Sequence, residues 1–180
     1  MLPADLAKRF EDCPWARHVA GVMLVLLESG DMPHLAGGIT LLIHSDIPVK
    51  VGLASSAAVQ VATAKAVAAL LGIELDPRRI AQACRTANVE VVGCEPGLVD
   101  HLTCLWGEAD HLLQIRCQPD DVLGQLALPR EVVFAGVDIG VRLPLYSQRY
   151  SDNRVSSLLG KYLIDLMLKR SGSIGDPTGG

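Results

Sequence analysis

The residues best suited to chemistry lie in a glycine loop that runs into an alanine-rich segment. Residues 48–58 read PVKVGLASSAA, and the alanine-rich composition after them favours a helix. The first amides of a helix have no intrahelical partner and carry the positive end of its dipole, so this segment could hold a phosphate group. The hydroxyls of Ser55 and Ser56 could cap the helix, or reach a phosphate oxygen or a hydrated Mg²⁺. In the alternative interpretation, Gly52 forms an ordinary turn and the serines are ordinary caps.

A carboxylate further along the chain could act on a hydroxyl group. Residues 88–101 read NVEVVGCEPGLVDH, and the apolar residues from Leu98 onward have helical spacing, which places Asp100 in the first turn of a helix. A carboxylate could orient a hydroxyl there and accept its proton during phosphoryl transfer. The alternative is a first-turn carboxylate that interacts only with the helix dipole. The sequence has no GxxxxGK(S/T) loop, so the phosphate site is not of the Walker A type.

Helices and short strands must position these residues. Periodicity and breaker residues predict a helix that begins at Leu98 and further helices over residues 14–29, 54–70, 77–91 and 151–168. We expect Gly72 to end the helix over 54–70, and Asp76 with Pro77 to begin the next one. Aliphatic and β-branched runs predict strands over residues 39–44, 112–117 and 132–137, the last two joined by a polar loop containing Pro119, Asp120 and Asp121.

The composition excludes several classes of protein. The chain has 180 residues, of which 49% are hydrophobic and 20% charged, so it is expected to form one globular domain and not a disordered chain. Aromatic residues make up 4% and the formal net charge is -4, which argues against a nucleic-acid surface. The longest apolar run, residues 22–27, is too short to span a bilayer, and no signal peptide opens the sequence, so we expect a soluble cytoplasmic protein with no membrane partner.

Three segments together resemble one enzyme family. Residues 48–58 resemble the second signature of the GHMP kinase superfamily, which includes galactokinase, homoserine kinase, mevalonate kinase and phosphomevalonate kinase; Lys50 stands where the family usually has glycine. Residues 88–101 resemble a galactokinase segment that ends in the catalytic aspartate, which aligns with Asp100. Residues 150–154, YSDNR, resemble a pattern of galactokinase and plant L-arabinokinase in which the tyrosine lies near the sugar. Seen alone, Tyr150 would be an ordinary surface or edge residue.

The resemblance implies a fold class and a division of the chain. The expected fold is α+β, the GHMP kinase N-terminal domain of the ribosomal protein S5 domain 2-like class, with a mixed sheet packed against helices. Residues 1–170 would form this domain in partial form, and residues 171–180, rich in glycine, serine and proline, would form a flexible tail.

The implied function is that of an ATP-dependent sugar kinase, which transfers the γ-phosphoryl group of ATP to a sugar hydroxyl with Mg²⁺ as cofactor. Asp100 would orient or deprotonate the hydroxyl, and Tyr150 would contact the sugar. The Mg²⁺ ligands would be Ser56 and either Asn88, which aligns with the glutamate ligand of the family, or Glu90 after a local shift. The phosphates would be bound by Lys50, Val51, Gly52, Leu53, Ala54, Ser55, Ser56 and Ala57.

Two departures from the family leave other functions open. Asn88 is neutral, and the sequence lacks both the Gly-Glu-His segment that opens galactokinases and their third glycine-rich motif. A fragment of this kind would expose apolar helix faces, unless a second chain supplies the missing N- and C-terminal parts. One alternative is therefore a non-catalytic or truncated remnant that binds nucleotide or sugar. Another is a GHMP kinase that phosphorylates a different small alcohol, such as homoserine or mevalonate.

Overall fold

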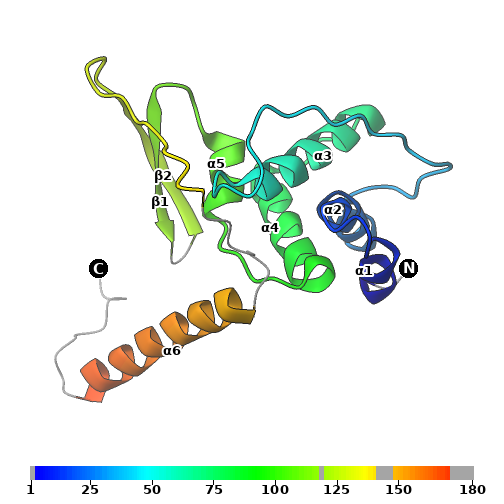
Figure 1. The fold of residues 1–180 in the computed structure, drawn as a ribbon. Coiled ribbons are helices and arrows are strands. Elements are labelled where there is room, and N and C mark those ends of the chain that lie inside the picture. The colour runs from blue at the N-terminus through cyan, green and yellow to red at the C-terminus, as the bar shows by residue number, and fades with distance from the viewer. Residues whose placement is uncertain (1–2, 118–119, 141–147, 171–180) are drawn as a thin grey trace. The chain divides into compact units, whose positions relative to one another are not determined.

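The computed structural model describes residues 3–117, 120–140 and 148–170, and the chain divides into two compact units, residues 1–143 and 144–180. The first unit contains five α-helices, a π-helical turn and a β-hairpin (Figure 1). Its elements are α1 (Pro3–Arg9), α2 (Ala16–Glu28), α3 (Ser55–Leu71), α4 (Pro77–Ala87), the π-helical turn η1 (Asn88–Val92), α5 (Val99–Trp106), β1 (His111–Cys117) and β2 (Asp120–Ala127). The described part of the second unit is one helix, α6 (Gln148–Arg170).

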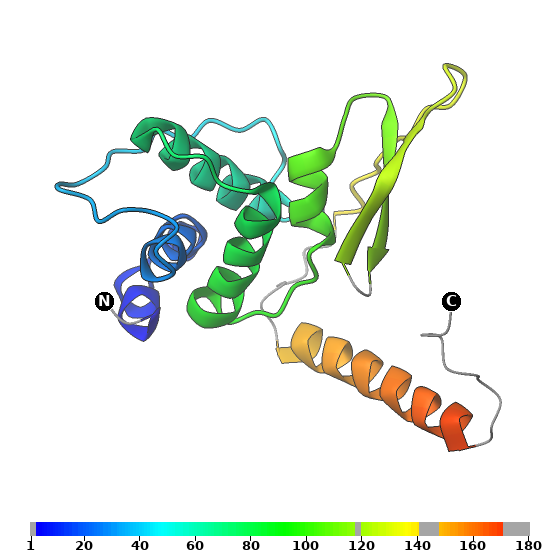
Figure 2. The same ribbon diagram turned by 180° about the vertical axis from the view of Figure 1, so that it is seen from behind.

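The core of the first unit forms where α2, α3 and α4 pack together. Figure 2 shows these helices from behind, with α5 next to the hairpin. Small side chains at the contacts let the helices approach closely, and a Cβ on Gly21 of α2 would lie 3.2 Å from the Cβ of Val91. The buried apolar side chains of this core are Val22, Val25, Leu26, Met32, Val61, Ala64, Val67, Ile80, Ala83, Cys84 and Ala87.

The predicted helices are present, and two of their boundaries follow the expected chemistry. Gly72 adopts a left-handed conformation with a φ of 65° at the end of α3, and the amide of the following Ile73 donates to the Ala68 carbonyl. The side chain of Asp76 accepts a hydrogen bond from the Arg78 amide at 2.6 Å, and Pro77 occupies the first turn of α4. None of the helices in the described part of the chain is both long and apolar enough to cross a membrane.

Two details of the helices differ from the prediction. The N-cap of α3 is Ala54, and no side chain accepts a capping hydrogen bond there. The prediction that Ser55 and Ser56 could cap this helix was therefore wrong. Ser55 and Ser56 lie instead inside the first turn, because the left-handed Ala54 turns the chain directly into the helix. The helix predicted over 77–91 is regular only to Ala87 and then continues as the π-helical turn η1. Gly93 ends this turn in a left-handed conformation, and its amide donates to the Asn88 carbonyl.

The sheet is smaller than predicted. The strand over 112–117 is confirmed as β1, which pairs antiparallel with β2. The register shifts between Gln114 and Ile115, where Leu123 is the extra residue on β2. The residues expected in a polar loop, Asp120 and Asp121, instead begin β2. The described residues form only this two-stranded antiparallel sheet. The prediction of a mixed sheet was therefore wrong for this part of the chain.

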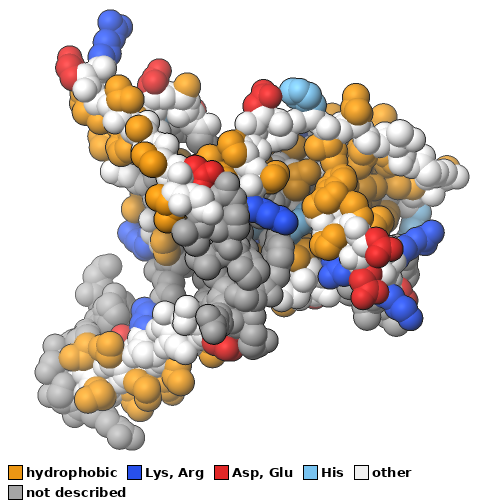
Figure 3. Space-filling view, in the orientation of Figure 1, with side chains coloured by type: hydrophobic (Ala, Val, Ile, Leu, Met, Phe, Trp, Pro, Cys, Tyr) orange, Lys and Arg blue, Asp and Glu red, His pale blue; other side chains and the backbone are white. Residues whose placement is uncertain are grey.

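The strands predicted over 39–44 and 132–137 are irregular in the structure. Both segments have the expected β-forming composition, but a strand is stabilised only when a neighbour pairs with its backbone and covers its side chains. Ile39 and Leu41 are half-buried against the core, but other apolar side chains of these segments are exposed, to 97% for Leu42 and 85% for Val133. The space-filling view shows apolar side chains at the surface on the hairpin side of the first unit and, separately, along α6 (Figure 3).

A cluster of buried polar side chains, here called the amide cluster, joins four elements of the first unit. It consists of His18 on α2, Gln60 on α3, Asn88 on η1 and His101 on α5. Gln60 and Asn88 exchange two hydrogen bonds between their side-chain amides, of 3.0 and 3.2 Å, and the Nε2 atom of His101 lies 3.1 Å from Gln60 Oε1. A hydrogen bond with Asn88 also involves the His18 ring. Because buried polar groups are costly without partners, the cluster fixes how these elements meet.

We expect acid to destabilise the first unit through the two histidines of the amide cluster. Burial lowers the pKa of His18 from 6.5 to about 4, and burial also lowers the pKa of His101. The unfolded chain therefore binds protons that the folded chain does not, and stability is lost as the pH falls from about 6.5 toward 4, by on the order of 3 kcal/mol for His18. Urea unfolding at several pH values measures this dependence. His18→Gln should flatten the plot of the free energy of unfolding against pH, whereas His44→Gln, at an exposed position, should leave it unchanged. Parallel plots for the wild type and His18→Gln would contradict the attribution of this pH dependence to His18.

A second prediction concerns the strained backbone at Lys50, which has a φ of 62°. Side chains other than glycine lose stability in this left-handed region, while glycine loses more entropy on folding, so Lys50→Gly should raise the free energy of unfolding by about 0.5–1 kcal/mol. Thermal unfolding should show a rise of about 1–4 °C. Lys50→Ala removes the same charge and keeps the strain, so it should give no increase. An equal rise in both variants would attribute the effect to the charge.

Candidate functional site

The backbone of residues 50–54 alternates in handedness as it enters α3. The φ angle is positive at Lys50, Gly52 and Ala54, at 62°, 83° and 53°, and is not positive at the two residues between them. Such alternation directs successive amides into one concavity, the arrangement known as an anion-binding nest. Lys50, which stands where the resemblance leads us to expect glycine, therefore has a left-handed backbone that glycine adopts without strain.

The first turn of α3 adds further hydrogen-bond donors at the same place. The amide of Ala58 makes the first hydrogen bond along the helix, to the Ala54 carbonyl at 3.0 Å, so the amides of Ser55, Ser56 and Ala57 have no intrahelical acceptor. Lys50, Gly52 and Leu53 are exposed, and both serines are half-buried. Ala57 is buried, at 2% exposed. The loop and the start of the helix thus offer a group of amides with a positive potential, reached from the exposed loop residues and the half-buried serines, which suits a phosphate group.

Asp100 lies in the first turn of α5, and its side chain is exposed. The next residue, His101, reaches Gln60 of α3 through the amide cluster, so the helix that carries the carboxylate is in contact with the helix that follows the glycine loop. The carboxylate also acts on its neighbours. It opposes the lowering of the His101 pKa by burial, and it adds to the effect of burial in raising the pKa of the Cys104 thiol one turn later. The structure therefore offers an ionisable oxygen on the element packed beside α3.

The three groups predicted to bind Mg²⁺ do not have equal access to the loop. Ser56 lies in the first turn of α3, but Asn88 is 3% exposed and its side-chain oxygen accepts a hydrogen bond from Gln60. Glu90 is exposed and lines a pocket on α4, away from the loop residues. Among the residues described by the structure, no group of three His, Cys, Asp or Glu side chains could hold a metal ion. These side chains therefore do not fit a resident Mg²⁺ at the loop.

Tyr150 lies in α6, in the second unit of the chain. Its side chain is outside the described part of the structure, so its predicted contact with the sugar stays a prediction.

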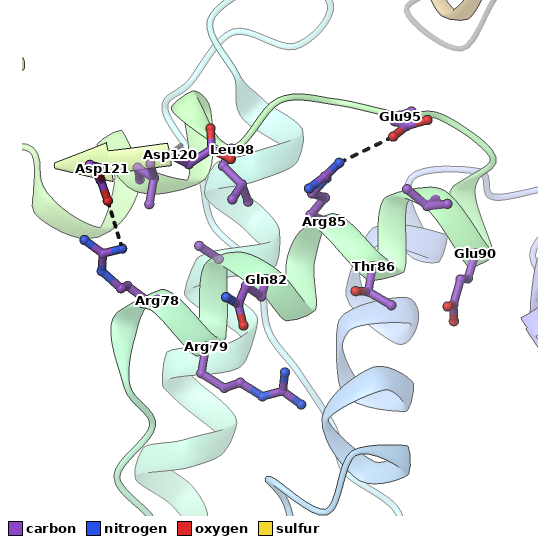
Figure 4. A pocket seen from close by; sticks show the side chains of 13 residues that line it. Arg78, Arg79, Gln82, Arg85, Thr86, Glu90, Glu95, Leu98, Asp120 and Asp121 are labelled. Carbon is purple, nitrogen blue, oxygen red and sulfur yellow. Dashed lines mark hydrogen bonds and ion pairs between the residues drawn. The ribbon is translucent and has the colours of Figure 1, made fainter. Parts of the chain in front are cut away.

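A pocket of about 720 Å³ lies over the polar face of α4, next to the start of β2 (Figure 4). Ion pairs lie at both ends of it, from Arg78 to Asp121 at 3.6 Å and from Arg85 to Glu95 at 3.4 Å. Gln82 lies between the two arginines on α4 (Figure 4). Sequence reasoning missed this pocket, although a polar stripe at helical spacing along residues 78–86 was a visible signal for one wall. Neither the glycine loop nor Asp100 lines it.

Sequence reasoning also missed Gln60. The signal for it was the single side-chain amide in the alanine-rich helix, five residues after Ser55. A polar side chain in a packed helix is either exposed to water or buried with a hydrogen-bond partner. The structure shows that Gln60 is fully buried and hydrogen-bonded.

Comparison with known proteins shows which proteins this chain is similar to. The chain is similar to L-arabinokinase of Arabidopsis thaliana, with 39% identity over 154 residues, which are 85% of this chain and 15% of that protein. It is also similar to the galactokinases of Roseiflexus sp. (strain RS-1), at 32% identity over 78% of this chain and 35% of the relative, and of Chloroflexus aurantiacus, at 34% identity over 81% and 36%. The chain therefore spans between about one seventh and about one third of the length of these relatives. No solved structure matches it.

The family model of the GHMP kinases N terminal domain matches residues 17–108, about half of the chain. This range contains the glycine loop, the start of α3, the amide cluster and Asp100. The resemblance of the chain to this family is thereby confirmed, and the chain belongs to the GHMP kinase family through its N-terminal domain. Residues 48–58 and 88–101 lie within the matched range, and residues 150–154 lie beyond it.

Proposed function

We propose that this chain provides the phosphate-binding part of an ATP-dependent sugar kinase of the galactokinase or L-arabinokinase type. The observation that carries the proposal is the pairing of two features on adjacent helices. The alternating backbone at Lys50, Gly52 and Ala54 leads into the free amides of α3, and α5, which carries the exposed Asp100, contacts α3 through the amide cluster. A donor of phosphoryl groups and an acceptor hydroxyl need groups of these two kinds side by side.

In the proposed reaction, the amides of Ser55, Ser56 and Ala57 bind the terminal phosphates of ATP and stabilise the negative charge that develops on them. Asp100 accepts a hydrogen bond from the sugar hydroxyl and takes its proton as the hydroxyl oxygen bonds to the γ-phosphorus. The bond between the γ-phosphorus and the bridging oxygen breaks, and ADP leaves with the electron pair of that bond. The products are a sugar phosphate and ADP.

The class of acceptor rests on the relatives. The named relatives are an L-arabinokinase and galactokinases, which supports a sugar hydroxyl as the acceptor, and Tyr150 remains the proposed sugar contact. Since the predicted ligands other than Ser56 do not lie free at the loop, no step of this reaction is assigned to a metal ion held by the chain.

A second candidate function is a non-catalytic remnant that binds nucleotide or sugar without turnover. One observation favours it: the Asn88 side chain, at the position predicted for a metal ligand, is neutral, buried and engaged by Gln60. The glycine loop would still bind phosphate in such a protein, because its donors belong to the backbone. Binding and turnover therefore have to be measured separately.

The role of Asp100 is tested by Asp100→Asn in a phosphoryl-transfer assay with galactose or L-arabinose as acceptor. Loss of the proton acceptor should lower kcat by about 100-fold or more and leave nucleotide affinity unchanged, because the loop is untouched. Glu108→Gln, at an exposed carboxylate just beyond α5, is the matched control and should keep full turnover. Unchanged turnover in Asp100→Asn would remove this residue from catalysis.

The loop is tested by calorimetric titration with a non-hydrolysable ATP analogue, with and without Mg²⁺ and each sugar. Gly52 has a φ of 83° and open space around the position of a Cβ, so Gly52→Ala disturbs the backbone without a clash and should weaken nucleotide binding by about tenfold or more. Gly37→Ala, at an exposed glycine without this conformation, should bind normally. Binding without turnover would support the remnant. Absence of nucleotide binding in the wild type would contradict the kinase, and binding of neither nucleotide nor sugar would contradict both functions.

A further inference from the structure

The side chain of Gln60 lies where four elements meet, and the proposed reaction gives it no role. It is 0% exposed, and all of its polar atoms have partners. Its Nε2 atom donates to Asn88 Oδ1 at 3.2 Å and to the Cys84 carbonyl at 3.4 Å. Its Oε1 atom accepts from Asn88 Nδ2 at 3.0 Å and lies 3.1 Å from His101 Nε2. A buried amide held on both ends in this way has one orientation available to it.

Gln60 connects the two halves of the proposed site along a short path. It lies on α3 five residues after Ser55, about one and a half helical turns from the free amides. Its partner His101 directly follows Asp100 on α5. One side chain therefore joins the helix that follows the phosphate loop to the helix that carries the carboxylate.

Apolar contacts hold α5 against several elements. The apolar cluster formed by Leu98 and Leu102 includes Ala81 of α4, and partly buried side chains of the hairpin pack against it. Leu105 packs against the core formed mainly by α2, α3 and α4.

The polar contacts of α5 are directional, whereas these apolar contacts are not. His101 Nε2 lies 3.1 Å from Gln60 Oε1 and 3.4 Å from Asn88 Nδ2. The contact between Gln60 and His101 therefore adds a directional constraint on the rotation of α5 relative to α3.

We propose that Gln60 is a positioning residue which, through His101, holds Asp100 in a fixed place relative to the phosphate loop. This inference rests on the proposed function for the role of Asp100. Burial lowers the pKa of His101, which supports a neutral ring whose Nε2–H donates to Gln60 Oε1. Small displacements of a reacting group cost large factors in rate, so an anchor of this kind affects turnover more than binding.

The test replaces Gln60 with Met, which has a similar length and no hydrogen-bonding amide. The matched control is Thr63→Val, because Thr63 is buried on the same helix and its hydroxyl bonds only within α3, to the Val59 carbonyl at 2.7 Å. Three quantities are measured on the full chain: kcat with saturating sugar, the Kd of a non-hydrolysable ATP analogue, and amide hydrogen exchange across residues 98–106.

Gln60→Met should lower kcat by about tenfold or more, change the nucleotide Kd by less than about threefold, and speed exchange in α5 by about tenfold or more. Thr63→Val should leave turnover and α5 exchange near the wild-type values. Gln60→Glu keeps an acceptor oxygen for His101 Nε2 and should recover most of the protection of α5.

Unchanged exchange in α5 of Gln60→Met would overturn the proposal. An equal loss of nucleotide binding, turnover and exchange protection across all helices would also overturn it, because that pattern indicates a purely structural role. If Gln60→Met does not fold, Gln60→Glu decides: loss of α5 protection despite the retained acceptor overturns the anchor. If the wild type transfers no phosphoryl group, the proposed function fails and, with it, the role assigned to Asp100. The α5 exchange then still decides whether Gln60 anchors that helix.

Discussion

The hydrogen bonds between the Gln60 and Asn88 side chains are the interaction on which the first unit depends. Both amides are removed from water, so each must find its donors and acceptors within the protein, and each finds them in the other. This requirement is directional, whereas the apolar contacts around it are not. The apolar surfaces of α2, α3 and α4 could pack in several registers, and the hydrogen-bonded pair of Gln60 and Asn88 selects one.

The same pair of hydrogen bonds explains why the Asn88 side chain is not free to bind Mg²⁺ at the loop, as the sequence analysis had considered. From the sequence alone, an asparagine at this position could be interpreted as a weak metal ligand, because divalent cations bind side-chain carbonyl oxygens. In the folded chain, that oxygen accepts a hydrogen bond from Gln60 of α3, and the Asn88 side chain is 3% exposed. The chemistry of the residue is as expected, but its partner comes from a segment 28 positions earlier, which local spacing does not reveal.

The helices were predictable because their signals are local. The Asp76–Pro77 start of α4 and the Gly72 end of α3 depend on the conformational preferences of single residues. The strands were less predictable, since residues 39–44 and 132–137 have the composition of strands but no hydrogen-bonded neighbour among the described residues. For the site, the glycine loop and Asp100 were found from motif spacing. The anchor at Gln60 was not found, because it depends on contacts between residues far apart in the sequence.

The π-helical turn at the end of α4 makes this stretch intolerant of changes in length. Such a turn holds one more residue than an α-helical turn, so loss of a single residue from Asn88–Val92 would restore the regular repeat and rotate everything after it by about 100° around the helix axis. The loop ahead of α5 would then leave in another direction. Among related sequences, insertions and deletions should accordingly be tolerated in the exposed segment before the glycine loop. They should be disfavoured between Asn88 and the start of α5.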